Sequence, residues 1–154
     1  PVIKPSLSIV VEGKLAGSLT DKNLRSIEQA VQTNTLFKGE HTVGLKFVNQ
    51  SESRKLNKQY ANNDYATDVL SFEYSSDSGD SMGDIVICTP IAAQQAKENG
   101  ISLNAELTLL IVHGVLHLLK YDHQTDQDTA SMDWLQSAIM KSLNYQYRDF
   151  KWSH

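Results

Sequence analysis

The sequence predicts an α+β fold, close to an α/β sandwich, in which a mixed sheet of about four strands packs with about five helices in one domain over residues 1–154. Three observations predict it. Short apolar runs bounded by turn residues alternate with helical patterns. The predicted elements follow the order β-α-β-α-β-β-α-α-α. The most apolar run, residues 107–119, has no charged side chain, so we expect a buried helix that lies centrally against the sheet.

The first half of the chain predicts two strands and two helices. The strands are expected from a short apolar run and from an alternation of apolar residues, and the helices from apolar residues at helical spacing. The expected strands are Leu7–Val11 and Thr42–Asn49, and the expected helices are about Asp21–Val31 and Ser51–Tyr60. Thr20 or Asp21 is the predicted N-cap of the first helix, and Ser51 that of the second.

The second half predicts two more strands followed by three helices. The expected strands are Thr67–Tyr74 and Asp84–Cys88, separated by a Ser/Gly/Asp-rich loop over residues 75–83. Thr89-Pro90 reads as a cap followed by proline at the first helical position, and Asn99-Gly100 as the matching stop. The apolar helix is expected to open near Asn104, and a last helix to run from about Asp126 to Leu143.

Composition excludes several classes of protein. The net charge of −4 argues against a protein that coats nucleic acid through bulk charge, although a local basic groove is compatible with it. A single cysteine, Cys88, rules out an internal disulfide and fits a reducing compartment. Leu7–Val11 is too short for the apolar core of a signal peptide, so we expect a cytoplasmic protein. The run 107–119 is also too short to span a bilayer.

Three histidines carry the strongest chemical signal. His113, His117 and His123 follow the spacing H-x3-H-x5-H, and the first two lie one helical turn apart. The three residues before His123 are enough to end the helix and to fold the chain so that His123 reaches the same ion as His113 and His117. Three imidazoles with one open position are typical of catalytic zinc, so the pattern predicts a hydrolytic zinc site with one ion per chain. The structural alternative is a pair of core histidines with satisfied hydrogen bonds, and nickel or iron would accept the same ligands.

Other residues are weaker candidates. Asp68, Asp84 and Asp122 are the carboxylates that could act as a general base, or could instead brace strand ends and orient a histidine. Cys88, in an apolar strand, is expected in the core rather than as a fourth ligand. The densest basic cluster is a candidate RNA contact, although such clusters are usually solvated helix faces, and it consists of Arg54, Lys55 and Lys58.

The segment HGVLHLLKYDH resembles the H-G-x-L-H-L-x-G-Y-D-H signature of the YbeY family of metal-dependent endoribonucleases. Two further segments match in order: Leu56-Asn57 with Tyr60, Asp64 and 67–72 (TDVLSF) resemble the family's LN-x-x-Y-R…D-x-P-T-D-V-L-S-F segment, and 83–87 resembles its G-D-I-x-I strand. The resemblance implies that His113, His117 and His123 bind zinc. It also implies cleavage of single-stranded RNA in ribosomal RNA maturation and ribosome quality control, with the small ribosomal subunit and a ribosome-assembly GTPase as partners.

The sequence departs from this family pattern at three positions. Ala61 replaces an arginine, which removes a cation that could hold a scissile phosphate; Arg54, Lys55 or Lys58 could supply the charge instead. Ala66 replaces a proline before the TDVLSF strand. Lys120 replaces a glycine, and if this residue ends the helix in a left-handed conformation, lysine costs roughly 1 kcal/mol more than glycine.

Two other functions are compatible with parts of the pattern. Metzincin proteases share the histidine spacing, but their general base is a glutamate at the position of Gly114. A ribosome-assembly factor that keeps zinc only as a structural pin is the second alternative, because Ala61 lacks the family's cation. The residues leave open whether water or the 2′-hydroxyl of the RNA would attack.

Overall fold

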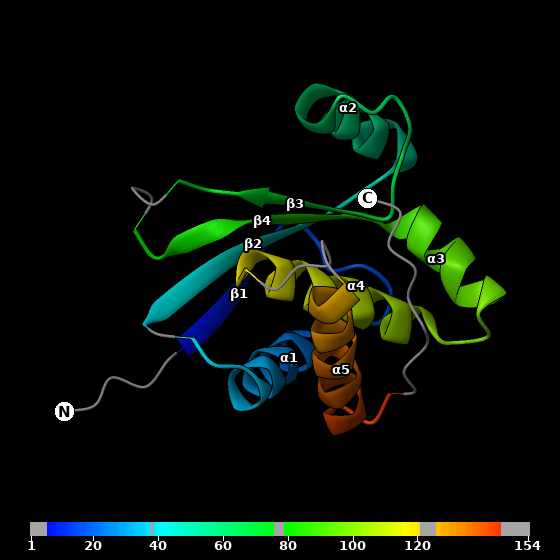
Figure 1. The fold of residues 1–154 in the computed structure, drawn as a ribbon. Helices are drawn as coiled ribbons and strands as arrows, with labels where there is room; N and C mark the ends of the chain where they lie inside the picture. Colours follow the sequence, from blue (N-terminus) through cyan, green and yellow to red (C-terminus); the bar gives the residue numbers. More distant parts are fainter. Residues whose placement is uncertain (1–5, 38, 76–78, 121–125, 146–154) are drawn as a thin grey trace.

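Four strands form one mixed sheet in the order β1-β2-β4-β3 (Figure 1). The structure is a computed structural model that describes residues 6–37, 39–75, 79–120 and 126–145. Parallel pairing joins β1 to β2 and β2 to β4, whereas β3 runs antiparallel to β4 and lies at one edge. The strands are β1 (Ser6–Glu12), β2 (Glu40–Val48), β3 (Val69–Glu73) and β4 (Ser81–Cys88). The predicted α+β fold with a four-stranded mixed sheet is confirmed.

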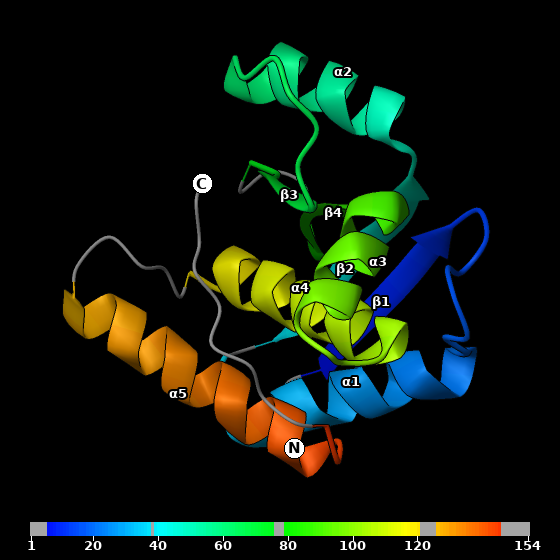
Figure 2. The same ribbon diagram turned by 90° about the vertical axis from the view of Figure 1, so that its right-hand side faces the viewer.

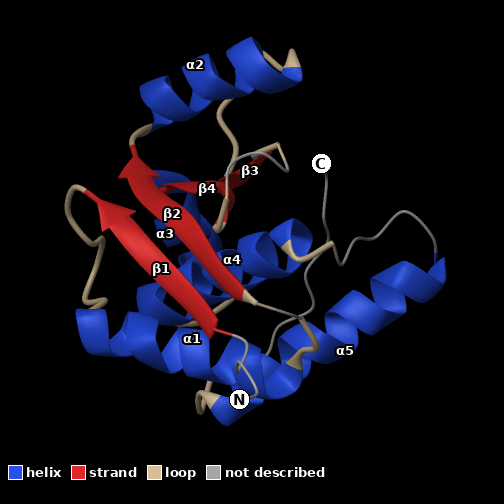
Figure 3. Cartoon of the chain, turned by 90° about the vertical axis from the view of Figure 1, so that its left-hand side faces the viewer, coloured by secondary structure: helices blue, strands red, loops and turns tan. Residues whose placement is uncertain are grey.

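The helices cover the two faces of the sheet unequally. One face packs against α4, with α1 and α5 beyond and beside it, while α2 stands over the opposite face (Figures 1 and 3). Turned by 90°, the molecule shows α4 in the middle of the helical layer, between the sheet and α5 (Figure 2). The helices are α1 (Asp21–Asn34), α2 (Gln50–Ala61), α3 (Thr89–Glu98), α4 (Leu103–Leu118) and α5 (Asp126–Ser142).

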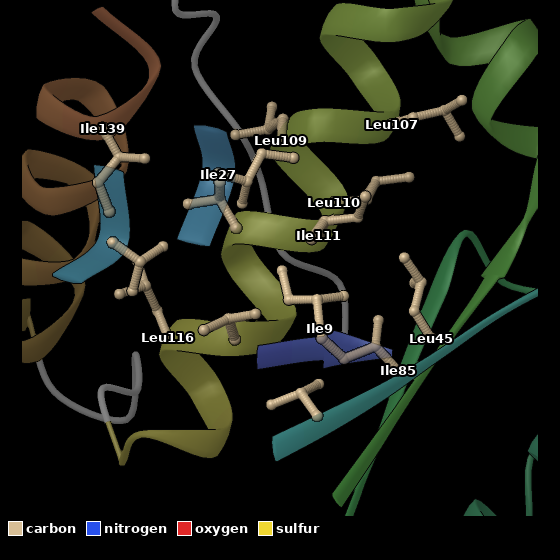
Figure 4. Close-up of a cluster of buried hydrophobic side chains, with 14 of the residues drawn as sticks. Ile9, Ile27, Leu45, Ile85, Leu107, Leu109, Leu110, Ile111, Leu116 and Ile139 are labelled. Carbon is tan, nitrogen blue, oxygen red and sulfur yellow. The ribbon is translucent and has the colours of Figure 1, made fainter. Parts of the chain in front are cut away.

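The core is built around α4, as its composition predicts. From Ala105 to Leu116 every residue of this helix is buried. Its leucines and Ile111 pack among side chains from the sheet and from the neighbouring helices, as Figure 4 shows with Ile9, Ile85 and Ile139 among the labelled residues. No single helix in the described residues is long and apolar enough to cross a membrane; α3 and α4 together pass that test but are bent by 116°.

Gly114 lets α4 approach the sheet closely. A Cβ atom at this position would lie 2.8 Å from Cδ1 of Ile85 and 3.0 Å from its Cγ1. Ile85 is completely buried in β4, so it has little room to move. The glycine therefore sets the distance between the sheet and the helical turn that carries His113 and His117.

A smaller apolar cluster lies between the sheet and α2. Val48, Val86 and Cys88 form its buried centre, with Leu56 and Phe72 packed against it. Cys88 is thus a core residue, as predicted, and burial raises the pKa of its thiol.

Several predicted boundaries are wrong, and three of them have a clear physical reason. The N-cap of α2 is Asn49 rather than Ser51, because Asn49 Oδ1 accepts from the backbone N–H of Glu52 at 2.8 Å. Thr89 is already helical in α3, and the capping position is Cys88, whose side chain makes no cap hydrogen bond. The fourth strand begins at Ser81 rather than Asp84, because pairing with β2 extends it into the expected loop.

Candidate metal and substrate site

His113 and His117 project from the last turns of α4 and line one pocket of about 180 Å³. Their ring centroids are 6.4 Å apart and their planes differ by 25°. His113 is buried, with 4% of its surface exposed, whereas His117 is exposed. The pair therefore has one side fixed in the core and one side open to a ligand from solvent.

Gln136 on α5 orients His113. Its Oε1 lies 2.8 Å from Nδ1 of His113, and both side chains are buried. An amide oxygen only accepts hydrogen bonds, so Nδ1 is the donor in this contact, and in the neutral ring Nε2 is then the nitrogen without a proton. A neutral imidazole held in this way by a hydrogen bond on its other nitrogen is the form that binds a metal.

The structure describes only part of the predicted ligand set. His123 and Asp122 lie outside the described residues, and within those residues no group of three His, Cys, Asp or Glu side chains is placed to hold a metal. Lys120, just before them, has φ 78°, so it does adopt the left-handed conformation that glycine favours. It also forms an ion pair with Glu73 at the end of β3.

The C-terminal end of α2 forms the wall opposite the histidines. Asn57, Ala61 and Asn63 line the pocket together with residues of β3. Asn57 holds this wall in shape: its Nδ2 donates to the carbonyl of Tyr65 at 2.9 Å, and its own carbonyl accepts from the N–H of Asn63 at 3.2 Å. Ala61 thus lines the histidine pocket, at the position where the family pattern described above has arginine.

Two of the three predicted RNA-binding cations face one carboxylate. Arg54 Nε lies 2.8 Å from Asp64 Oδ1, and Lys58 Nζ lies 3.9 Å from Asp64 Oδ2. The hydrogen bond from Arg54 lowers the pKa of Asp64, and the same contact raises the pKa of Arg54. All three side chains are exposed, so this contact is weak and could open for a phosphate. Lys55 is exposed on the same helix.

The structure does not bring Asp84 to the histidines. Asp84 points to the α2 side of β4, while its neighbour Ile85 packs on α4. It accepts a hydrogen bond from the Tyr74 hydroxyl, and this bond raises the pKa of Tyr74. It lines a separate pocket of about 590 Å³ between the sheet and α2.

Asp68 is buried at the start of β3 and does not line the histidine pocket. Its Oδ1 accepts from the N–H of Val69 at 2.7 Å and from the Thr67 hydroxyl at 3.2 Å. With the amide of Gln95 turned to satisfy its neighbours, Gln95 nitrogen donates to Asp68 Oδ2 at 3.3 Å and to Glu106 Oε2 at 3.0 Å. These contacts match the bracing role weighed for Asp68.

Fold and site together define an α+β protein with a histidine pair, on a buried helix, suited to bind a metal. A family model described as endoribonuclease YbeY matches residues 13–144, and the chain belongs to this family. The chain is 46% identical over 102 residues, 66% of each protein, to an endoribonuclease YbeY of Bordetella petrii. It is 34% identical to one of Cupriavidus pinatubonensis, covering 97% of this chain and 76% of that protein.

A solved structure supports the fold. The solution structure of TM1509 from Thermotoga maritima superposes with a TM-score of 0.60 at 25% sequence identity, covering 90% of this chain and 91% of the other. The resemblance to the YbeY family seen in the three sequence motifs is therefore confirmed, and so is the fold that it implies.

Proposed function

We propose that this protein is a zinc-dependent endoribonuclease that cleaves single-stranded RNA in the cytoplasm, during ribosomal RNA maturation and ribosome quality control. Membership of the endoribonuclease YbeY family supports the reaction class. The single observation that carries the proposal is the histidine pair of α4, oriented by Gln136 in a pocket open to solvent. The small ribosomal subunit and a ribosome-assembly GTPase are the partners that we propose from the family resemblance.

His113, His117 and His123 are the residues that would hold the zinc ion. When bound, zinc would act as a Lewis acid that polarises a phosphoryl oxygen and lowers the pKa of water to about 7. The chain's own residues supply the positioning: Gln136 fixes the tautomer of His113, and Gly114 sets the helix against β4. Substrate reaches the site from the exposed side, where His117 and Ala61 lie.

A comparison of substrates tests this proposal. Purified wild-type protein is expected to cut a labelled single-stranded ribosomal RNA fragment, and to leave the same sequence intact when it is annealed to a complement or made as DNA. His117→Ala, purified in parallel, should be inactive, which controls for a contaminating nuclease. Equal cleavage by the variant, or none by zinc-loaded wild type, would overturn the proposal.

One observation favours a second candidate function. No lysine or arginine side chain lines the histidine pocket in the described part of the chain, because Ala61 stands where the family has arginine. A ribosome-assembly factor with a structural zinc would need no such cation. It predicts that zinc removal lowers the thermal stability while the zinc-loaded protein cuts no RNA.

The Ala61→Arg substitution is expected to raise the cleavage rate by about 10- to 100-fold. Position 61 lies in the pocket, and one charge-assisted hydrogen bond to a phosphate stabilises by about 1.5–3 kcal/mol. Cleavage rates at saturating RNA measure the effect. Ala61→Gln, which adds length without charge, is the matched control. An unchanged rate in Ala61→Arg would show that the reacting phosphate does not lie within reach of position 61.

Gln136→Met is expected to weaken zinc binding by about 10- to 100-fold, because methionine keeps the volume of the side chain but has no amide oxygen to accept the hydrogen bond from His113 Nδ1–H. Competition with a chelating dye measures the affinity. Gln136→Glu keeps an acceptor and should bind zinc more tightly than the methionine variant. Equal affinity in wild type and Gln136→Met would show that Gln136 does not orient the ligand.

A further inference from the structure

The outer edge of β3 carries backbone groups that point away from the sheet. In the described residues β3 pairs with β4 alone. Cys88 N–H donates to Asp68 carbonyl at 2.8 Å, and Tyr74 N–H to Met82 carbonyl at 2.9 Å. Hydrogen-bonded and non-hydrogen-bonded positions alternate along an antiparallel strand. The odd-numbered positions of β3 therefore direct their N–H and carbonyl groups outward, and these are Val69, Ser71 and Glu73.

Only one of these outward amides is available at the histidine pocket. Val69 N–H already donates to Asp68 Oδ1 at 2.7 Å, and Glu73 does not line the pocket. Ser71 lines it together with His113 and His117. Its side chain lies on the same face of β3 as the buried Val69, which packs in the core around α4.

In the histidine pocket, a phosphate would meet uncharged hydrogen-bond donors instead of the arginine that the family has at position 61. Ala61 carries no charge, and the amide nitrogen of Asn57 is engaged by Tyr65. Backbone N–H groups bind phosphate oxygens in many nucleic-acid complexes, and an oriented amide needs no rearrangement as charge develops. Ser71 lines this pocket, and its amide is a donor that the backbone of β3 holds in place.

We propose that the Ser71 N–H, at the outer edge of β3, binds a non-bridging oxygen of the scissile phosphate of single-stranded RNA. The inference rests on the proposed endoribonuclease function and adds the group that replaces the family's arginine in holding the phosphate. A contact from the backbone reads no base, so it fits a substrate recognised as an extended strand rather than by sequence. Ser71 is then a substrate-binding residue through its main chain.

A proline scan of the strand edge tests this inference. Ser71→Pro removes the outward amide without removing a bond to β4, a position where sheets accept proline. It is expected to lower the cleavage rate by about 10²-fold, the typical loss for one such donor. Ser71→Ala keeps the amide and loses only the hydroxyl, so it should lose much less activity than Ser71→Pro. Glu73→Pro removes the next outward amide, outside the pocket, together with the ion pair to Lys120, and should lose much less activity than Ser71→Pro.

A second measurement does not depend on a variant that folds. In ¹⁵N-labelled, zinc-loaded wild type, a 2′-O-methyl oligonucleotide that the protein leaves uncut in a parallel assay should shift the Ser71 amide resonance downfield and slow its hydrogen exchange. Leu70 and Phe72, whose amides face β4, are internal controls that should shift much less.

The outcomes separate the two proposals. Wild-type cleavage with full activity in a folded Ser71→Pro, or a bound oligonucleotide that leaves the Ser71 amide unmoved, would overturn the inference and leave the endoribonuclease proposal standing. No cleavage by zinc-loaded wild type would overturn the proposed function itself. Loss of activity in both proline variants with unchanged zinc content would overturn the specific assignment to Ser71, since any distortion of the edge would then suffice.

Discussion

His117→Ala is expected to abolish RNA cleavage while leaving the fold intact. The several kcal/mol of stabilisation that a catalytic metal supplies correspond to about a 10³-fold loss in rate or more. Because His117 is exposed, its truncation leaves no cavity, and the free energy of unfolding of the metal-free protein should change by less than about 0.5 kcal/mol. Cleavage rate, zinc content and urea denaturation of the same preparation measure the loss of activity, the expected loss of bound zinc and the unchanged stability.

The matched control is a histidine outside the pocket. His41 on β2 does not line the pocket of His113 and His117 but a neighbouring one, beside Leu118 and Lys120, and His41→Ala should retain both zinc and cleavage. His113→Ala, in contrast, should lose zinc and also stability, because the ring is buried in contact with Gln136. A His117→Ala protein that still holds one zinc and cuts RNA at the wild-type rate would refute the histidine pair as the metal site.

Gly114→Glu is expected to prevent folding. The new Cβ atom would lie only 2.8–3.1 Å from the side-chain carbon atoms of Ile85. Overpacking of this kind costs about 1–3 kcal/mol. An unpaired carboxylate buried between α4 and β4 adds several kcal/mol more. The sum is comparable with the total stability of about 5–15 kcal/mol of a typical domain. Soluble yield and far-UV circular dichroism after refolding measure the outcome.

Gly114→Ala separates the steric effect from the charge. It should fold with a loss of about 1–2 kcal/mol, since the clash with Ile85 is offset in part by the better helix propensity of alanine. A folded and stable Gly114→Glu protein would show that the helix can move away from β4. The same packing explains why a protease with a glutamate at this position does not fit this chain.

The fold was predictable where the pattern of apolar residues was strong. The uncharged run 107–119 predicted a buried central helix, and α4 is buried along nearly its whole length because the sheet, α1, α3 and α5 enclose it. Boundaries were less predictable, since they depend on contacts distant in sequence. Ser81 belongs to β4 because β2 pairs with it, and nothing in the Ser/Gly/Asp-rich local sequence indicates that pairing.

The candidate site was only partly predictable. The spacing of His113 and His117 predicted their convergence, because both lie on one helix. Gln136 was missed, since it is 23 residues from His113 and reaches it only through the packing of α5 on α4. Ser71 was missed because its role depends on which edge of the sheet β3 occupies. Asp84 could be assigned to the wrong face because the direction of a side chain in a strand depends on register.

The most direct test of the metal-dependent endoribonuclease is a zinc titration of chelator-treated protein, followed by the rate of single-stranded RNA cleavage. The rate is expected to rise in proportion to bound zinc and to level off at one ion per chain. A rate that does not depend on zinc, or one zinc bound per chain with no cleavage, would contradict the proposed function.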